Sequence, residues 1–208
     1  AAQERGFQQP QSRKAENWSH AFFELYAELP LAERQARSFA YALGQEPVRI
    51  HANSLIAGQL YQHGDACPEV RGVPNDPRWE DFCVEKQGKK SLATLDEEVQ
   101  LFRQGFSDTL GSPGHIGWDW GRLLSQGFAG MRRLLEEKRR KQPNDTEAQH
   151  FYDAVEIVLD ALSAWISSHE TKLREMMELE PDHKRKRELG ELAECCKAIQ
   201  NSPPRTFR

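Results

Sequence analysis

Apolar residues recur every three or four positions along most of this chain, which is the pattern of amphipathic helices. In the first part, this spacing predicts a helix over residues 16–28, and Pro30 interrupts it where a new helix can start. A second helix is expected from Leu31 to Leu43, with Gly44 ending it. Residues 1–13 are polar and rich in Gln, which predicts a flexible lead-in before a helical part spanning 14–208.

The second half of the chain predicts three further helices. A polar turn at 142–146 separates the first two, with Asp145 or Thr146 as the expected N-cap. Pro181 ends the second helix, and the last runs from about Asp182 to Ile199, with Leu189, Leu192, Cys196 and Ile199 facing inward. The apolar stripe of the first consists of Trp120, Leu123, Leu124, Phe128, Met131, Leu134 and Leu135. That of the second consists of Phe151, Val155, Val158, Leu162, Trp165 or Ile166, Leu173 and Met176.

The stretch between these two helical parts has a different pattern of apolar and polar residues. Residues 48–51 and 55–58 are short β-like runs joined at Asn53, which predicts a small strand pair. Residues 64–91 contain many Gly and Pro with little periodicity and are expected to form a loop. A short helix from about Leu95 to Phe106 follows. The predicted fold class is therefore mainly α, with antiparallel helices and a short β element.

Composition narrows the class of protein. Among 208 residues, 28 Lys and Arg stand against 32 Asp and Glu, a net charge of −4 that argues against a general nucleic-acid binder. No apolar run is long enough to span a membrane, and no signal segment opens the chain. The four cysteines lack zinc-site spacing and indicate a reduced, cytoplasmic protein without a metal site.

The basic runs at 132–133, 138–141 and 184–187 alternate with glutamates on predicted helices. They favour a solvated helix surface carrying pairs at i,i+4 spacing. A phosphate-binding face is the alternative.

The glycine-rich turn at 111–119 is the one stretch whose composition suits the placement of functional side chains. Its glycines allow a tight bend, and Asp119 is placed to cap the helix that follows. His115 and Trp118 would then lie on a loop at a helix N-terminus, where backbone N–H groups and a ring nitrogen can meet a polar ligand. The alternative is that His115 satisfies a buried carbonyl and Trp118 packs in the core.

Several separate segments resemble the glycyl radical enzymes of the pyruvate formate-lyase type. The run Gly114–Gly130 is similar to the family's Gly-His segment, and Phe151–Leu162 is similar to the helix that follows. Residues 182–196 with the Pro-Pro-Arg-Thr-Phe sequence at 203–207 resemble a third segment, and residues 50–58 with Pro68–Glu69 resemble a fourth and fifth. Their order and spacing make the resemblance specific over roughly residues 15–208.

This resemblance implies a place in a much larger enzyme. The family fold is a ten-stranded α/β barrel, of which this chain would be the N-terminal helical part, truncated at its C-terminus. A glycyl radical, installed by a separate iron–sulfur, S-adenosylmethionine-dependent activating enzyme, and a cysteine thiyl carry the family's chemistry. Neither radical-bearing segment falls within residues 1–208, so no catalytic residue and no bound cofactor is expected in this chain.

The implied function is that of an anaerobic lyase or dehydratase acting on a small polar organic substrate, the chain being inert on its own. His115 and Trp118 become candidate substrate-binding residues, since in several members a residue near the Gly-His turn reaches the substrate cavity. Cys67 and Glu69 have the Cys-x-Glu spacing of the thiyl loop but lie too early in the chain to be the catalytic pair. The expected partners are the rest of the polypeptide, the activating enzyme and the substrate; a homodimer stays open.

Two departures from the family pattern bear on these expectations. Asn53–Ser54 replace the usual acidic pair, and the stretch from Glu69 to Gly114 is shorter than in most members. Two alternative functions remain: a free-standing helical module that buries a partner against its apolar stripes, and a small enzyme that uses His115.

Overall fold

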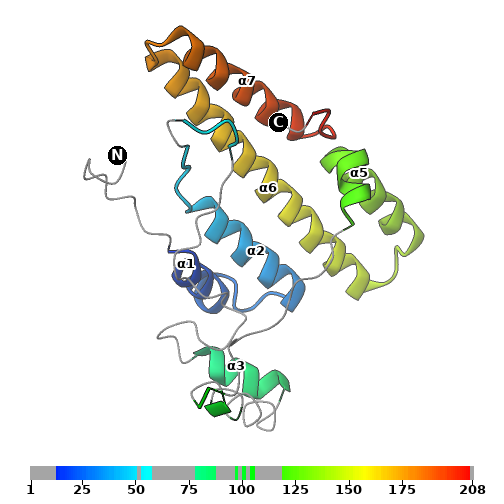
Figure 1. Cartoon of the computed structure of the whole chain (residues 1–208). Coiled ribbons are helices and arrows are strands. Elements are labelled where there is room, and N and C mark those ends of the chain that lie inside the picture. Colours follow the sequence, from blue (N-terminus) through cyan, green and yellow to red (C-terminus); the bar gives the residue numbers. More distant parts are fainter. Residues whose placement is uncertain are drawn as a thin grey trace. The chain divides into compact units, whose positions relative to one another are not determined.

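The computed structural model describes residues 13–50, 53–57, 78–87, 97, 100–101, 104–105 and 119–206. Helices dominate these residues, and no strand is present among them, as Figure 1 shows. The elements are α1 (Lys14–His20), η2 (Ala21–Leu25), α2 (Leu31–Gly44), α3 (Arg78–Gln87), α5 (Trp120–Lys141), α6 (Thr146–Leu179) and α7 (His183–Ile199).

The chain divides into two compact units. One comprises residues 1–63 and 118–208 and includes every helix named above except α3. The other comprises residues 64–117 and includes α3, where the rings of Trp79 and Phe82 meet edge to face with centroids 6.0 Å apart. The longer unit is therefore assembled from two stretches that are far apart in the sequence.

Helix α6 is the helix against which most of the longer unit packs. It is 34 residues long, and α2, α5 and α7 all pack against it (Figure 1). Pro181 separates α6 from α7, which returns antiparallel beside it. A buried apolar cluster lies between these two helices and consists of Leu173, Leu189, Leu192, Ala193 and Cys196. The inward placement predicted for Leu189, Leu192 and Cys196 is confirmed.

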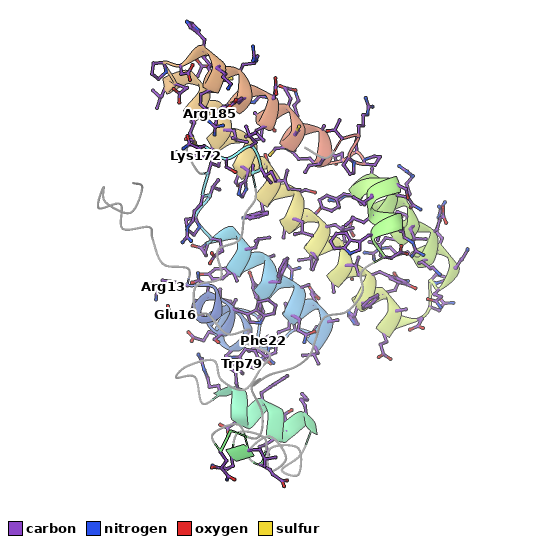
Figure 2. All side chains as sticks on the ribbon, viewed as in Figure 1. Arg13, Glu16, Phe22, Trp79, Lys172 and Arg185 are labelled. Atoms are coloured by element: carbon purple, nitrogen blue, oxygen red, sulfur yellow. The ribbon has the colours of Figure 1, made fainter. Side chains whose placement is uncertain are left out.

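The predicted first helix is present as two consecutive pieces, because α1 continues directly into one turn of π-helix, η2. Phe22 in η2 is 1% exposed and lies under Arg34 of α2, whose guanidinium carbon is 3.7 Å from the ring centroid. The same Arg34 donates a hydrogen bond from Nε to the Phe22 carbonyl at 2.7 Å. Arg34 thus satisfies a backbone carbonyl within the π-turn and covers the ring of Phe22, which is labelled in Figure 2.

The predicted strand pair is wrong for the residues that the structure describes. Residues 47–50 and 53–57 form no strand, and Ile50 and Ala57 pack against the cluster between α6 and α7. The hydroxyl of Ser54 donates to the Ile56 carbonyl at 2.7 Å and lies 3.2 Å from the Ile56 backbone N–H. This local turn satisfies backbone groups that a strand would have paired with a neighbour.

The loop expected over 64–91 is also wrong in part, because Arg78–Gln87 form α3. Trp79 and Phe82 are three positions apart and so lie on one helix face. Trp79 is 8% exposed. Within the expected helix at 95–106, residues 97, 100 and 101 are helical, and the rest lie largely outside the described residues.

Candidate functional site

The candidate site begins at Asp119, the last residue of the glycine-rich stretch 111–119 and the residue that precedes α5. Asp119 is the N-cap, and its Oδ1 accepts a hydrogen bond from the Arg122 backbone N–H at 3.0 Å, which confirms the predicted cap. His115 and Trp118, the two residues predicted to bind substrate, lie outside the described residues. Their role stays a prediction.

Eight residues after Asp119, α5 is interrupted at Gly127. Its φ of 60° and ψ of −172° belong to a region that only glycine adopts readily, so the two halves of α5 meet at a kink. The C-terminal segment crosses this kink: a Cβ on Gly127 would lie 2.6 Å from the backbone of both Ser202 and Pro203. The Ala129 backbone N–H donates to the Asn201 carbonyl at 3.2 Å. The break therefore makes room for the C-terminal segment and supplies a donor to it.

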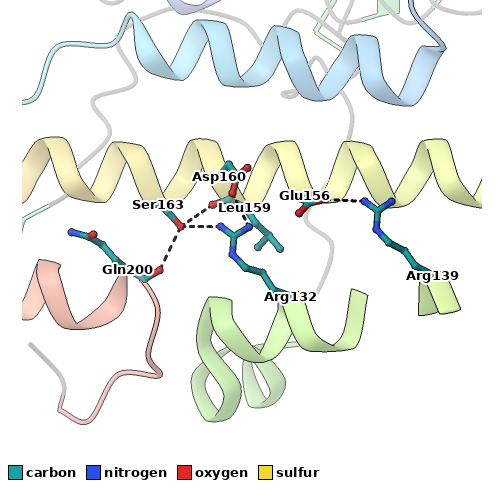
Figure 3. Close-up of polar contacts among 7 residues, drawn as sticks. All are labelled: Arg132, Arg139, Glu156, Leu159, Asp160, Ser163 and Gln200. Atoms are coloured by element: carbon teal, nitrogen blue, oxygen red, sulfur yellow. Dashed lines mark hydrogen bonds and ion pairs between the residues drawn. The ribbon is translucent and has the colours of Figure 1, made fainter. Parts of the chain in front are cut away.

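A polar cluster fixes this crossing to α6 (Figure 3). The Ser163 hydroxyl donates to the Leu159 carbonyl at 2.9 Å and lies 3.4 Å from the carbonyl of Gln200. Arg132 Nη1 pairs with Asp160 at 2.7 Å, and its Nη2 is 3.5 Å from the Ser163 oxygen. Residues from α5, α6 and the C-terminal segment thus share one set of contacts.

Further ion pairs tie α5 and α7 to α6. Arg139 of α5 contacts Asp153 at 2.6 Å and Glu156 at 2.9 Å on α6. These pairs join two helices, whereas the basic runs were predicted to pair at i,i+4 spacing. That spacing occurs in Arg187 with Glu191, at 3.9 Å.

Between α6 and α7, Arg174 bridges Glu170 and Glu194 at 2.9 Å each. The hydrogen bonds that Arg174 donates to Glu194 and to Glu170 raise the pKa of Arg174, and the bond from Arg174 lowers the pKa of Glu194. Gln200 also donates to Glu170 at 2.8 Å. These contacts extend the polar cluster from the C-terminal segment along α6.

The two cysteines of α7 have different surroundings. Cys196 is 8% exposed in the cluster between α6 and α7, whereas Cys195 is partly exposed. Burial, with a smaller effect from Cys195, raises the pKa of the Cys196 thiol to about 11. A thiol held neutral in this way is a poor nucleophile and a poor metal ligand. Cys196 therefore acts as a core residue.

The described arrangement positions chain segments rather than reacting groups. Within the described ranges, no cluster of three His, Cys, Asp or Glu side chains is placed to hold a metal ion. The described helices include none that is both long and apolar enough to cross a bilayer. Sequence reasoning identified Gly127 and Pro203 within two separate motifs, but their contact in space was not predicted.

The chain was compared with protein-family models, curated proteins and solved structures. The family model described as "PFL-like: Pyruvate formate lyase-like" matches residues 3–208. Among curated proteins, a probable dehydratase, YbiW, of Escherichia coli is 24% identical over 89% of this chain. An isethionate sulfite-lyase of Desulfovibrio desulfuricans is 32% identical over 54% of this chain. The chain spans 27% of the length of the first protein and 14% of the second.

Solved structures give the same picture for the fold. The B12-independent glycerol dehydratase from Clostridium butyricum, in a glycerol-bound form, superposes with a TM-score of 0.68 at 20% identity. It covers 93% of this chain, which corresponds to 29% of that enzyme. A structure of 1,2-propanediol dehydration in Roseburia inulinivorans gives a TM-score of 0.69 at 20% identity, over 91% of this chain and 28% of that one.

Proposed function

Because this chain belongs to the pyruvate formate lyase-like family of glycyl radical enzymes, we propose that it is the N-terminal helical part of a longer lyase or dehydratase. The observation that carries the proposal is the extent of the match. Nearly the whole chain is covered, yet it spans only 27% of the curated dehydratase and 29% of the solved one. In such an enzyme, the thiyl cysteine and the radical glycine come from the rest of the polypeptide.

The substrate class proposed is a small hydroxylated organic molecule. The similar proteins are named for reactions of isethionate, glycerol, 1,2-propanediol and trans-4-hydroxy-L-proline. Each of these compounds carries a hydroxyl group on a short carbon skeleton. His115 and Trp118 are proposed to face this substrate from the turn before α5, with Asp119 fixing the helix start beside them.

The described residues contribute position rather than chemistry. Gly127 lets the segment at 201–203 cross α5, and Ser163 lies within reach of Gln200 just before that crossing. This segment is proposed to lead into the rest of the enzyme in a fixed direction. A separate S-adenosylmethionine and iron–sulfur activating enzyme is proposed to install the radical, and the 208-residue chain alone is expected to have no activity.

The decisive experiment is to measure the mass of the native polypeptide in anaerobic cell lysate with an antibody against this chain. A band several times 23.9 kDa, with a glycyl-type doublet in the electron paramagnetic resonance spectrum of the activated protein, is the expected result. A band at 23.9 kDa would rule out the radical enzyme.

A helical interaction module is the second candidate, and one observation favours it. Phe151 on α6 is 57% exposed although the sequence pattern places it on the inward stripe. A short native polypeptide that co-purifies with one stoichiometric partner would support this candidate.

A further inference from the structure

An apolar groove runs between α5 and α6, away from the polar cluster at the Gly127 kink. Its volume is about 670 Å³. Met131, Leu134 and Leu135 line it from α5, and Phe151 and Val155 line it from α6. Few charges reach it, and they are Lys138 on α5 and Asp145 and Glu147 at the start of α6.

The groove is only partly covered by the chain itself. Phe151 exposes 57% of its surface, and Met131, Leu134 and Val155 are half-buried. By contrast, Tyr152 on the floor is 9% exposed, and its hydroxyl is hydrogen-bonded to the Gln142 side chain. The buried Tyr152 hydroxyl thus has a hydrogen-bond partner, whereas the apolar side chains that form the walls of the groove stay accessible. A continuous accessible apolar patch of this kind is typical of a docking surface rather than of scattered surface residues.

The shape of the groove indicates what fits it. Two antiparallel helices whose apolar side chains recur at three- and four-residue spacing leave a furrow that accepts the side-chain ridge of a third helix. Ala148 also lines the groove, and its small side chain permits close approach of a partner. A flat or purely polar partner would leave Phe151 unburied.

We propose that this groove is filled by an amphipathic helix from the part of the enzyme's polypeptide that follows this chain. The proposal rests on the proposed function. Its support is that the matched relatives are more than three times as long as this chain, so most of the polypeptide is left to pack against it. A second copy of the chain is the competing occupant.

The test uses photo-crosslinking in the native-length polypeptide. A Phe151→p-benzoylphenylalanine variant places the photoreactive ketone at the open wall of the groove. Leu179→p-benzoylphenylalanine is the matched control, since Leu179 is on the same helix, 85% exposed and outside the groove. If the Phe151 variant does not fold, Met131→p-azidophenylalanine probes the opposite wall.

The expected result is a cross-link inside one polypeptide, from position 151 to a peptide beyond residue 208, in several-fold higher yield than from position 179. Cross-links between two copies would overturn the proposal in favour of a dimer interface. Cross-links confined to residues 1–208, or none, would also overturn it. The mass and radical measurements are independent of these outcomes, so a true radical enzyme with a differently filled groove would be recognised as such.

Discussion

The two helical hairpins that share α6 are held together in different ways. Between α6 and α7 the contact centres on buried apolar side chains, with Leu173 at 0% and Leu189 at 1% exposure, and the Arg174–Glu194 ion pair lies beside them. Between α5 and α6 the contact depends more on charge, through Arg132 and Arg139, and it leaves Phe151 in the open. Ile50 and Ala57 cover the apolar cluster of the first hairpin, whereas the second hairpin leaves an apolar groove open.

The largest effect on stability is expected at the hairpin of α6 and α7. Leu173→Ala should lower the free energy of unfolding by about 2–5 kcal/mol, because a fully buried leucine leaves a cavity when shortened. Leu179→Ala on the same helix is 85% exposed and should change it by less than about 0.5 kcal/mol. Urea unfolding of both variants measures the difference. Equal effects would mean that the hairpin core is not where the stability lies.

The next effect is expected at the kink of α5. Gly127→Ala should cost about 1–3 kcal/mol, since the new Cβ meets the backbone of Ser202 and Pro203 at a positive φ. Gly121→Ala is the matched control on the same helix, because its Cβ would meet Asp119 only at 3.7 Å and alanine favours helix. Hydrogen exchange should show faster exchange at the Ala129 amide in Gly127→Ala alone. Unchanged exchange there would show that the crossing is not coupled to the kink.

A smaller effect on stability is expected for the ion pairs between α5 and α6. Arg139→Met keeps most of the side-chain volume and should lower the free energy of unfolding by about 1 kcal/mol, because the Arg139 side chain is only 19% exposed and has two acidic partners. The loss should shrink as salt is added. Arg187→Ala, with a side chain 72% exposed and its partner at 3.9 Å, should be near neutral. A loss for Arg139→Met that is independent of salt would point to packing instead.

The smallest effect concerns the thiols of α7. In the folded chain, iodoacetamide should label Cys195 before Cys196 at pH 8, because burial raises the Cys196 pKa to about 11. The neutral thiol stabilises the folded state fully below the unfolded pKa of about 8.5, and this contribution is lost as the pH rises toward 11. The alkaline loss of stability should be smaller in Cys196→Ala. Mass spectrometry of the labelled peptides and unfolding at several pH values measure both outcomes.

Helix spacing and capping could be predicted from the sequence because they are local. The apolar pattern placed α2, α5, α6 and α7, and Asp119 and Asp145 accept the capping hydrogen bonds expected of them. The predicted strand pair was wrong because a β-like run does not specify a partner strand. Ile50 instead packs against the apolar cluster between α6 and α7.

The site was less predictable because it depends on contacts between distant residues. The φ of Gly127 follows from the segment at 201–203, about which local sequence contains no signal. The exposure of Phe151 likewise depends on how three helices share α6. Motif resemblance identified the family, which periodicity and composition alone could not do.

The discontinuous make-up of the longer unit also bears on how this protein can change in length. Residues 64–117 leave that unit and return to it, so α2 and α6 meet only after this stretch has been closed into a loop. Doubling such a loop adds only about 0.6 kcal/mol of closure entropy. We therefore expect that lengthening the chain between His63 and Trp118 costs the contact between α2 and α6 little free energy.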